Sequence, residues 1–310
     1  MLIESLHRLP QTLAQIGGEV EERDIPSRLR TILPQQKVSP VRFEIVSDRV
    51  TVLPQPASPS AIDAEATLSA KQGLISAGEK LLDELRRSNC DPRLVDNISE
   101  LQSQLEKDTD VIRLGIANLG CSAMCGRFES ELPDAVGALL RSQTVGISMY
   151  VAQFPEWQRF SENAAVADID EDLTKVIAEA AQQVVSTLRS KPHLADPEVP
   201  KILAYLLSFI ADPAISAKRS AFAVLRTLEN MIIAIYSYGA DIFESTFKKS
   251  ADPIAKGMSR ILVTGLFGVA LATATSLAPV SVQMQGGVWL RMASDLVQQQ
   301  LERMSLSLPG

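Results

Sequence analysis

The chain has 310 residues, of which 46% are hydrophobic, 22% are charged and only 5% are aromatic. This hydrophobic content excludes a disordered protein, and the scarcity of aromatic residues favours helices over sheets, with a core of Leu, Ile, Val and Ala. The net charge of −7 argues against a nucleic-acid partner, because phosphate contacts need clustered Lys and Arg. The composition therefore predicts a mainly α-helical protein, a multi-helix bundle.

Residues 1–60 are predicted to form an N-terminal unit of short elements. Four prolines divide residues 1–40 into short helical pieces, because proline cannot continue a helix. In residues 41–53, apolar and polar side chains alternate on both sides of Ser47-Asp48, which predicts a small β-hairpin. Such a hairpin is marginal alone, so we expect it to lean on helices or on a second copy of the protein. A proline-rich linker ends the unit.

Residues 61–247 are predicted to be a helical body. Apolar side chains recur at helical spacing up to Arg87, and Asp91 with Pro92 then has the form of a helix start, with Asp91 as N-cap. Prolines mark the later breaks, because each ends or restarts a helix. Further helices are expected at about residues 110–126, 132–153, 156–166, 170–190, 198–211 and 214–247.

A helix-pairing seam is predicted in the second of these helices. Its apolar residues follow a 4-3-4 spacing, which is typical of the contact positions of a coiled coil. The members are Leu94, Ile98, Leu101 and Leu105. About two heptads are too few to establish an independent coiled coil, so two interpretations stay open. The seam either pairs with another helix as a coiled coil or packs on the rest of the fold.

Residues 248–310 hold the most unusual segment, because residues 261–290 contain no charged side chain. The part before Pro279, residues 261–278, would be ~27 Å long as a helix, close to the hydrocarbon thickness of a bilayer. It is predicted to be a transmembrane or membrane-inserting helix, followed by an amphipathic terminal helix. Its apolar residues include Ile261, Leu262, Leu266, Phe267, Val269, Leu271 and Leu277.

Two patterns accompany this segment. A small-residue stripe allows close helix packing, either in lipid or in a bundle; it consists of Gly265, Gly268, Ala272 and Ser276. A basic collar precedes the segment and consists of Lys248, Lys249, Lys256 and Arg260. By the positive-inside rule the collar places the N-terminal body in the cytoplasm. We therefore expect a membrane-associated protein with membrane lipid as a partner; the alternative is a buried helix of a cytoplasmic bundle.

Residues that carry chemistry are few. The two histidines, His7 and His193, lie in no metal-binding motif. Cys121 and Cys125 are one helical turn apart, and we expect them to be packed side chains rather than a metal or redox pair. The acidic run Asp168–Asp172 is expected to cap a helix. We assign no catalytic residue, no metal ligand and no cofactor.

Three functions remain open from the sequence. The first is a non-catalytic scaffold that binds a protein partner or self-associates and is anchored at the cytoplasmic face of a membrane. The second is a membrane-perturbing effector that inserts residues 261–290 when it oligomerises. The third is an all-α enzyme or ligand-binding bundle without a recognisable motif.

Overall fold

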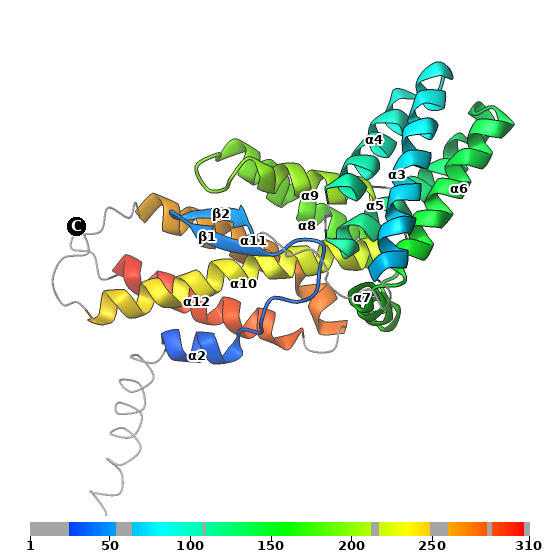
Figure 1. Ribbon diagram of the computed structural model, residues 1–310. Coiled ribbons are helices and arrows are strands. Elements are labelled where there is room, and N and C mark those ends of the chain that lie inside the picture. Colours follow the sequence, from blue (N-terminus) through cyan, green and yellow to red (C-terminus); the bar gives the residue numbers. More distant parts are fainter. Residues whose placement is uncertain are drawn as a thin grey trace, which may run out of the picture.

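The computed structural model describes residues 25–53, 64–107, 110–211, 217–248, 260–283 and 287–306 (Figure 1). These residues form eleven α-helices and one two-stranded antiparallel sheet, which confirms the mainly helical fold with a small hairpin. The helices are α2 (Ile25–Ile32), α3 (Ala64–Arg87), α4 (Pro92–Glu106), α5 (Val111–Phe128), α6 (Asp134–Val151), α7 (Pro155–Val166), α8 (Glu171–Ser190), α9 (Glu198–Ser208), α10 (Lys218–Lys248), α11 (Arg260–Gln283) and α12 (Val288–Leu306). The strands are β1 (Phe43–Val46) and β2 (Arg49–Val52).

Helix α10 is the central element of the body. From Ser220 to Tyr236 every side chain except that of Arg226 is buried, so this part of the helix is covered on all sides. Helices α2, α7, α8, α9 and α11 and strand β1 pack around it. Most of these buried side chains are apolar, and a helix stretch that is covered on all sides lies inside the protein.

Helices α3 to α6 form an arm that projects from the body (Figure 1). The turn between α3 and α4 is set by Asp91, whose side chain accepts a hydrogen bond from the Arg93 amide and confirms the predicted N-cap. Two hydrogen bonds show that α3 and α6 run antiparallel. The Thr67 hydroxyl, early in α3, donates to the side chain of Gln153 just after α6, and the Leu74 carbonyl, later in α3, accepts from Gln143, earlier in α6. Helix α6 packs on α3 and α5.

Both edges of the hairpin form hydrogen bonds with other parts of the chain. In β2, the Val50 amide donates to the Leu194 carbonyl and the Val50 carbonyl accepts from the Asp196 amide, each at 2.9 Å. On the β1 side, the Phe43 amide donates to the side-chain oxygen of Gln36 at 2.9 Å, and the same side chain donates back to the Phe43 carbonyl. Of the two predicted alternatives, helices or a second copy, the structure shows contact with the body of the same chain.

The membrane segment predicted for residues 261–278 is part of α11, which packs inside the protein. Among the described residues, no helix combines the length and apolar character that a bilayer span requires. The side chains of Leu266, Phe267 and Leu277 are at most 1% exposed, because α11 packs against α8, α10 and α12. The transmembrane expectation is thus without support, since packing within the chain already covers these side chains.

The end of α11 also differs from the prediction, because the helix continues through Pro279 to Gln283. Proline cannot donate the backbone hydrogen bond that would run to the Thr275 carbonyl. Both residues lie on the exposed side of α11, where water can bond that carbonyl. The helix therefore tolerates a proline that the sequence suggested would end it.

Candidate functional site: an exposed face on the arm

A surface feature of the arm lies on α6. Six exposed positions follow each other at a 3-4-3-4-3 spacing, the repeat that packs one helix on another. We call them the α6 face: Ala135, Ala138, Ser142, Val145, Met149 and the C-cap residue Ala152. Val145 is 58% exposed and Met149 is 68% exposed, so no other part of the described chain covers them. The spacing is that of a helix-pairing seam, and this seam faces solvent.

The α6 face is also free of charge. From Ala135 to Pro155 the only charged residue is Arg141, which lies beside the face rather than in it. Solvent-exposed sides of helices normally carry charged and polar residues. An exposed side with a contact repeat and without charges is instead typical of an interaction surface.

The opposite sides of α6 are fixed in the arm. Asn118 of α5 is 1% exposed and its amide donates to the Thr144 carbonyl and to the Ser148 hydroxyl, both at 2.9 Å. Toward α3, Gln143 donates to the Leu74 carbonyl at 2.9 Å. These buried polar contacts hold α6 in one rotational setting, so the α6 face is presented without rearrangement.

The seam predicted from the sequence lies in the interior. Leu94, Ile98, Leu101 and Leu105 are each at most 2% exposed, between α3 and α5. The structure thus brings the four residues together as part of the arm's core, where they have no free surface for a partner.

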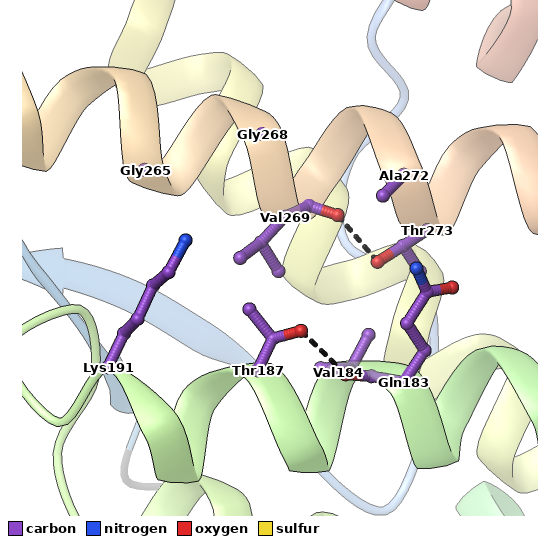
Figure 2. Close-up of a pocket in the computed structure, with 9 residues that line it drawn as sticks. All are labelled: Gln183, Val184, Thr187, Lys191, Gly265, Gly268, Val269, Ala272 and Thr273. Carbon is purple, nitrogen blue, oxygen red and sulfur yellow. Dashed lines mark hydrogen bonds between the residues drawn. The ribbon is translucent and has the colours of Figure 1, made fainter.

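A groove of about 250 Å³ lies between α8 and α11 (Figure 2). It contains three of the four stripe residues, Gly265, Gly268 and Ala272, and faces Val184 and Lys191 of the α8 side. A Cβ atom on Gly268 would meet no atom within 4 Å, so this glycine does not bring the two helices into close contact. The groove exists because the glycines have no side chain to fill the space between α8 and α11.

The polar groups of the groove are mostly engaged. Figure 2 shows that the Thr187 hydroxyl donates to the Gln183 carbonyl and the Thr273 hydroxyl to the Val269 carbonyl, each within its own helix. Ser276, the fourth stripe residue, donates to the side-chain oxygen of Gln183. The groove is smaller than the ~300 Å³ at which ligand pockets usually begin, and few of its polar groups remain for a ligand.

The rest of the predicted membrane segment is only partly described. Val269 is buried and Leu271 is half-buried against the core. The side chains of Ile261 and Leu262 lie outside the described residues. The same holds for the basic collar, Lys248, Lys249, Lys256 and Arg260.

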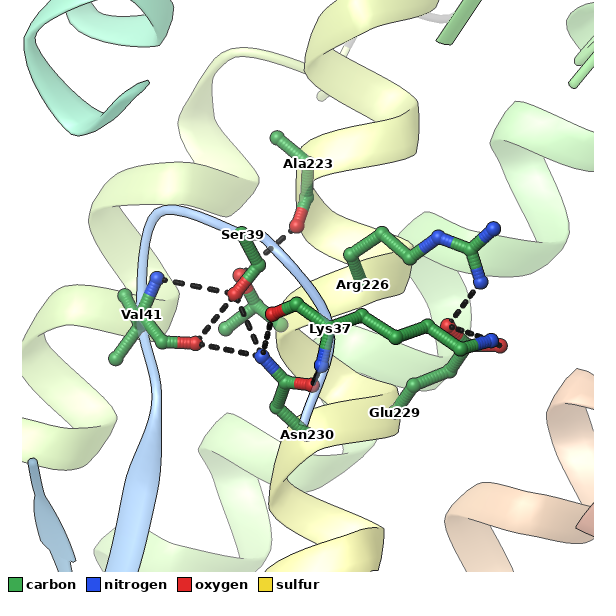
Figure 3. A network of polar contacts seen from close by, with 8 residues as sticks. Lys37, Ser39, Val41, Ala223, Arg226, Glu229 and Asn230 are labelled. Atoms are coloured by element: carbon green, nitrogen blue, oxygen red, sulfur yellow. Dashed lines mark hydrogen bonds and ion pairs between the residues drawn. The ribbon is translucent and has the colours of Figure 1, made fainter. Parts of the chain in front are cut away.

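A buried polar cluster joins the loop after α2 to α10 (Figure 3). Glu229 is 3% exposed and lies between two cations, Arg226 at 2.5 Å and Lys37 at 3.3 Å. Burial lowers the pKa of Lys37. The next residue, Asn230, accepts from the Lys37 amide at 2.7 Å and donates to the Lys37 carbonyl and the Ser39 hydroxyl, both at 2.8 Å. Because the Glu229 carboxylate is paired with a cation on each side, we call the cluster the clamp: it holds the loop after α2 on α10.

A second polar cluster lies where α4, α5 and α9 meet. The hydroxyl of Tyr205, the side-chain oxygen of Gln104 and the Nε atom of Arg113 are buried and make no hydrogen bond within the chain. Burial raises the pKa of Tyr205 and lowers that of Arg113. Buried polar groups without a hydrogen-bond partner cost stability.

The remaining candidates have structural environments. Cys121 is fully buried and burial raises the pKa of its thiol, while the Cys125 thiol donates to the Cys121 carbonyl. Asp170 accepts from the Leu173 amide at 2.8 Å, which confirms that the acidic run caps α8. His193 is exposed after α8, and His7 lies outside the described residues. In the described part of the chain, no three His, Cys, Asp or Glu residues are grouped as metal ligands.

Comparisons with known proteins add no relative to this picture. No protein-family model matches the chain, and no curated protein and no solved structure is detectably similar to it.

Proposed function

We propose that this protein is a helical scaffold that binds a protein partner through the α6 face. The observation that supports the proposal is the exposed, uncharged 3-4-3-4-3 repeat from Ala135 to Ala152. Helix-in-groove and helix-on-helix recognition use such repeated anchor positions on one side of a helix. Val145 and Met149 would be the anchors, because they have the largest side chains of the six residues.

The arm is suited to this role for a geometrical reason. Helix α6 packs only its other sides against α3 and α5, and the arm projects away from the body (Figure 1). A partner helix can lie along the α6 face without displacing any described element. Binding would then cost little conformational entropy in this protein, since the face is already formed.

Membrane contact is not part of this proposal. To reach lipid, α11 would have to leave α8, α10 and α12 and expose side chains such as Leu266, Phe267 and Leu277. Exposing each large apolar side chain costs about 1.5–3 kcal/mol. The α6 face needs no such release.

Photocrosslinking in living cells tests the proposal. A photoreactive residue replaces Met149, and as a matched control a second chain carries it at Val166, which is 74% exposed on α7. We expect a discrete crosslinked product from position 149 that is absent from position 166 and lost when Val145→Glu is added. Equal products from both positions, or none from position 149, would refute partner binding by this face.

A further inference from the structure

The partner most consistent with the α6 face is a second copy of this chain. We infer that two copies associate through their α6 faces, with the two α6 helices antiparallel. This inference rests on the proposed function and names the partner. It draws on three observations: the positions of the larger side chains in the face, the absence of charge and the position of the body relative to α6.

The first observation concerns size. In an antiparallel helix pair, positions of the two contact classes of the repeat face each other. Met149 of one copy then faces Ala138 of the other, and Val145 faces Ser142. Each of the two larger side chains thus meets a smaller one, and no two large side chains collide. In a parallel pair, Met149 would face Met149 and Ser142 would face Ser142, which crowds the first layer and leaves a gap in the second.

The second observation concerns charge. A partner of a different kind is usually selected by charges that flank the contact positions. Here the flanks offer Arg141 and Ser148 on one side. In the antiparallel pair Arg141 lies opposite Ser148 of the other copy rather than opposite Arg141, so no like charges meet. The α6 face is thus electrostatically compatible with itself.

The third observation concerns space. The C-terminal end of α6 leads into α7 and the body, whereas its N-terminal end lies toward the tip of the arm (Figure 1). Antiparallel pairing places the two bodies at opposite ends of the contact. Parallel pairing would bring both bodies to the same end.

The size of the contact sets the expected affinity. From Ala135 to Ala152 the α6 face covers 17 residue steps, which is roughly 25 Å at the rise of an α-helix. One helix pair of that length buries less than the ~1,200 Å² at which stable interfaces begin, so we expect a dissociation constant on the order of tens of micromolar. The dimer should therefore appear only at high protein concentration.

Sedimentation of the full chain measures the association. We expect the average mass to rise toward that of a dimer with concentration, and Val145→Glu to keep the protein monomeric. Val145 is exposed in the monomer, so the substitution should leave folding intact, which circular dichroism checks. The matched control, Val166→Glu on α7, should behave like the original chain. A monomer at all concentrations, or the same mass profile for all three proteins, would overturn self-association.

Cysteine crosslinking measures the orientation. In a chain with Cys90 and Cys125 replaced by serine, Ala138→Cys is mixed with Met149→Cys under oxidation. The antiparallel pair predicts disulfide dimers from the mixture and none from Ala138→Cys alone, because equivalent positions 138 lie about 16 Å apart along the axis. Dimers of Ala138→Cys alone would overturn the orientation. If photocrosslinking at Met149 captures only a different protein, self-association fails while partner binding by the α6 face stands.

Discussion

Replacing Asn230 by alanine should destabilise the protein by more than a typical single substitution. Asn230 is fully buried and connects α10 to the loop after α2 through the Lys37 amide, the Lys37 carbonyl and the Ser39 hydroxyl. Ser39 keeps a partner without it, because its hydroxyl donates to the Val41 carbonyl. The two main-chain groups of Lys37 lose theirs.

The magnitude follows from these two groups. Each buried polar group left without a partner costs about 1–3 kcal/mol, so Asn230→Ala should cost roughly 2–4 kcal/mol, reduced by water that reaches the half-buried Lys37. The matched control is Asn97→Ala on α4. Asn97 is half-buried, and its side chain donates to the Arg93 carbonyl of its own helix in a solvent-exposed hydrogen bond, so the loss in this variant should stay within about 0.5 kcal/mol.

Urea unfolding followed by circular dichroism gives both free energies. Hydrogen exchange adds a local measurement, because the Lys37 amide should lose its protection in Asn230→Ala. A loss below about 1 kcal/mol, or a loss equal to that of Asn97→Ala, would show that the polar contacts of Asn230 do not hold the loop.

Three further predictions concern single side chains. Gly268→Ala should stabilise the protein by roughly 0.5–1 kcal/mol, because the new methyl group meets open space. In Gly265→Ala the new methyl group would lie 2.9 Å from Leu194, so the gain in stability should shrink or vanish. Equal unfolding midpoints of the two variants would contradict this expectation. Burial raises the pKa of Tyr236 from 10.0 to about 12, so the stability that its protonated hydroxyl contributes is present below pH 10 and lost as the pH rises through 12, by about 3 kcal/mol. Unfolding titrations in this pH window should show a smaller loss for Tyr236→Phe. Tyr205→Phe removes a buried hydroxyl without a partner and should leave the free energy of unfolding unchanged or raise it by up to about 1 kcal/mol; a clear loss in urea unfolding would mean that the hydroxyl is satisfied.

The helices could be predicted because local signals and tertiary packing agree. Asp91 and Asp170 cap the helices that the sequence suggested, and the predicted helices of residues 61–247 end within four residues of the observed ones. The hairpin turn at Ser47-Asp48 is likewise local, since both residues adopt positive φ angles.

The environment of α11 could not be predicted, because it depends on distant elements. An uncharged helix is compatible with lipid and with a protein interior, and its composition left the choice nearly balanced. The cover for Leu266 and Phe267 comes from α8, α10 and α12. No local property of residues 261–278 encodes that cover.

The α6 face was missed because α6 carries two apolar sides. Leu140, Ile147 and Val151 mark the side that is buried, and they are larger than the Ala and Ser residues of the exposed repeat. From the sequence, the larger side chains identify the core side of a helix, while small residues at the contact positions of a repeat look neutral. Exposure distinguishes them, and exposure is a property of the fold.

The clamp on α10 has a consequence for how the chain is made. Lys37 and Glu229 are 192 positions apart, and Arg30 bonds Asp241 across 211 positions. A ribosome therefore releases α2 and the hairpin long before their binding site exists, and contacts of such sequence separation form late. Helix α2 and the loop after it can therefore pack in place only after α10 has been synthesised. If translation stopped before α10, α2 and the loop after it would have no surface to pack on. The truncated product would also lack the central helix of the body, and we expect cellular quality control to degrade it.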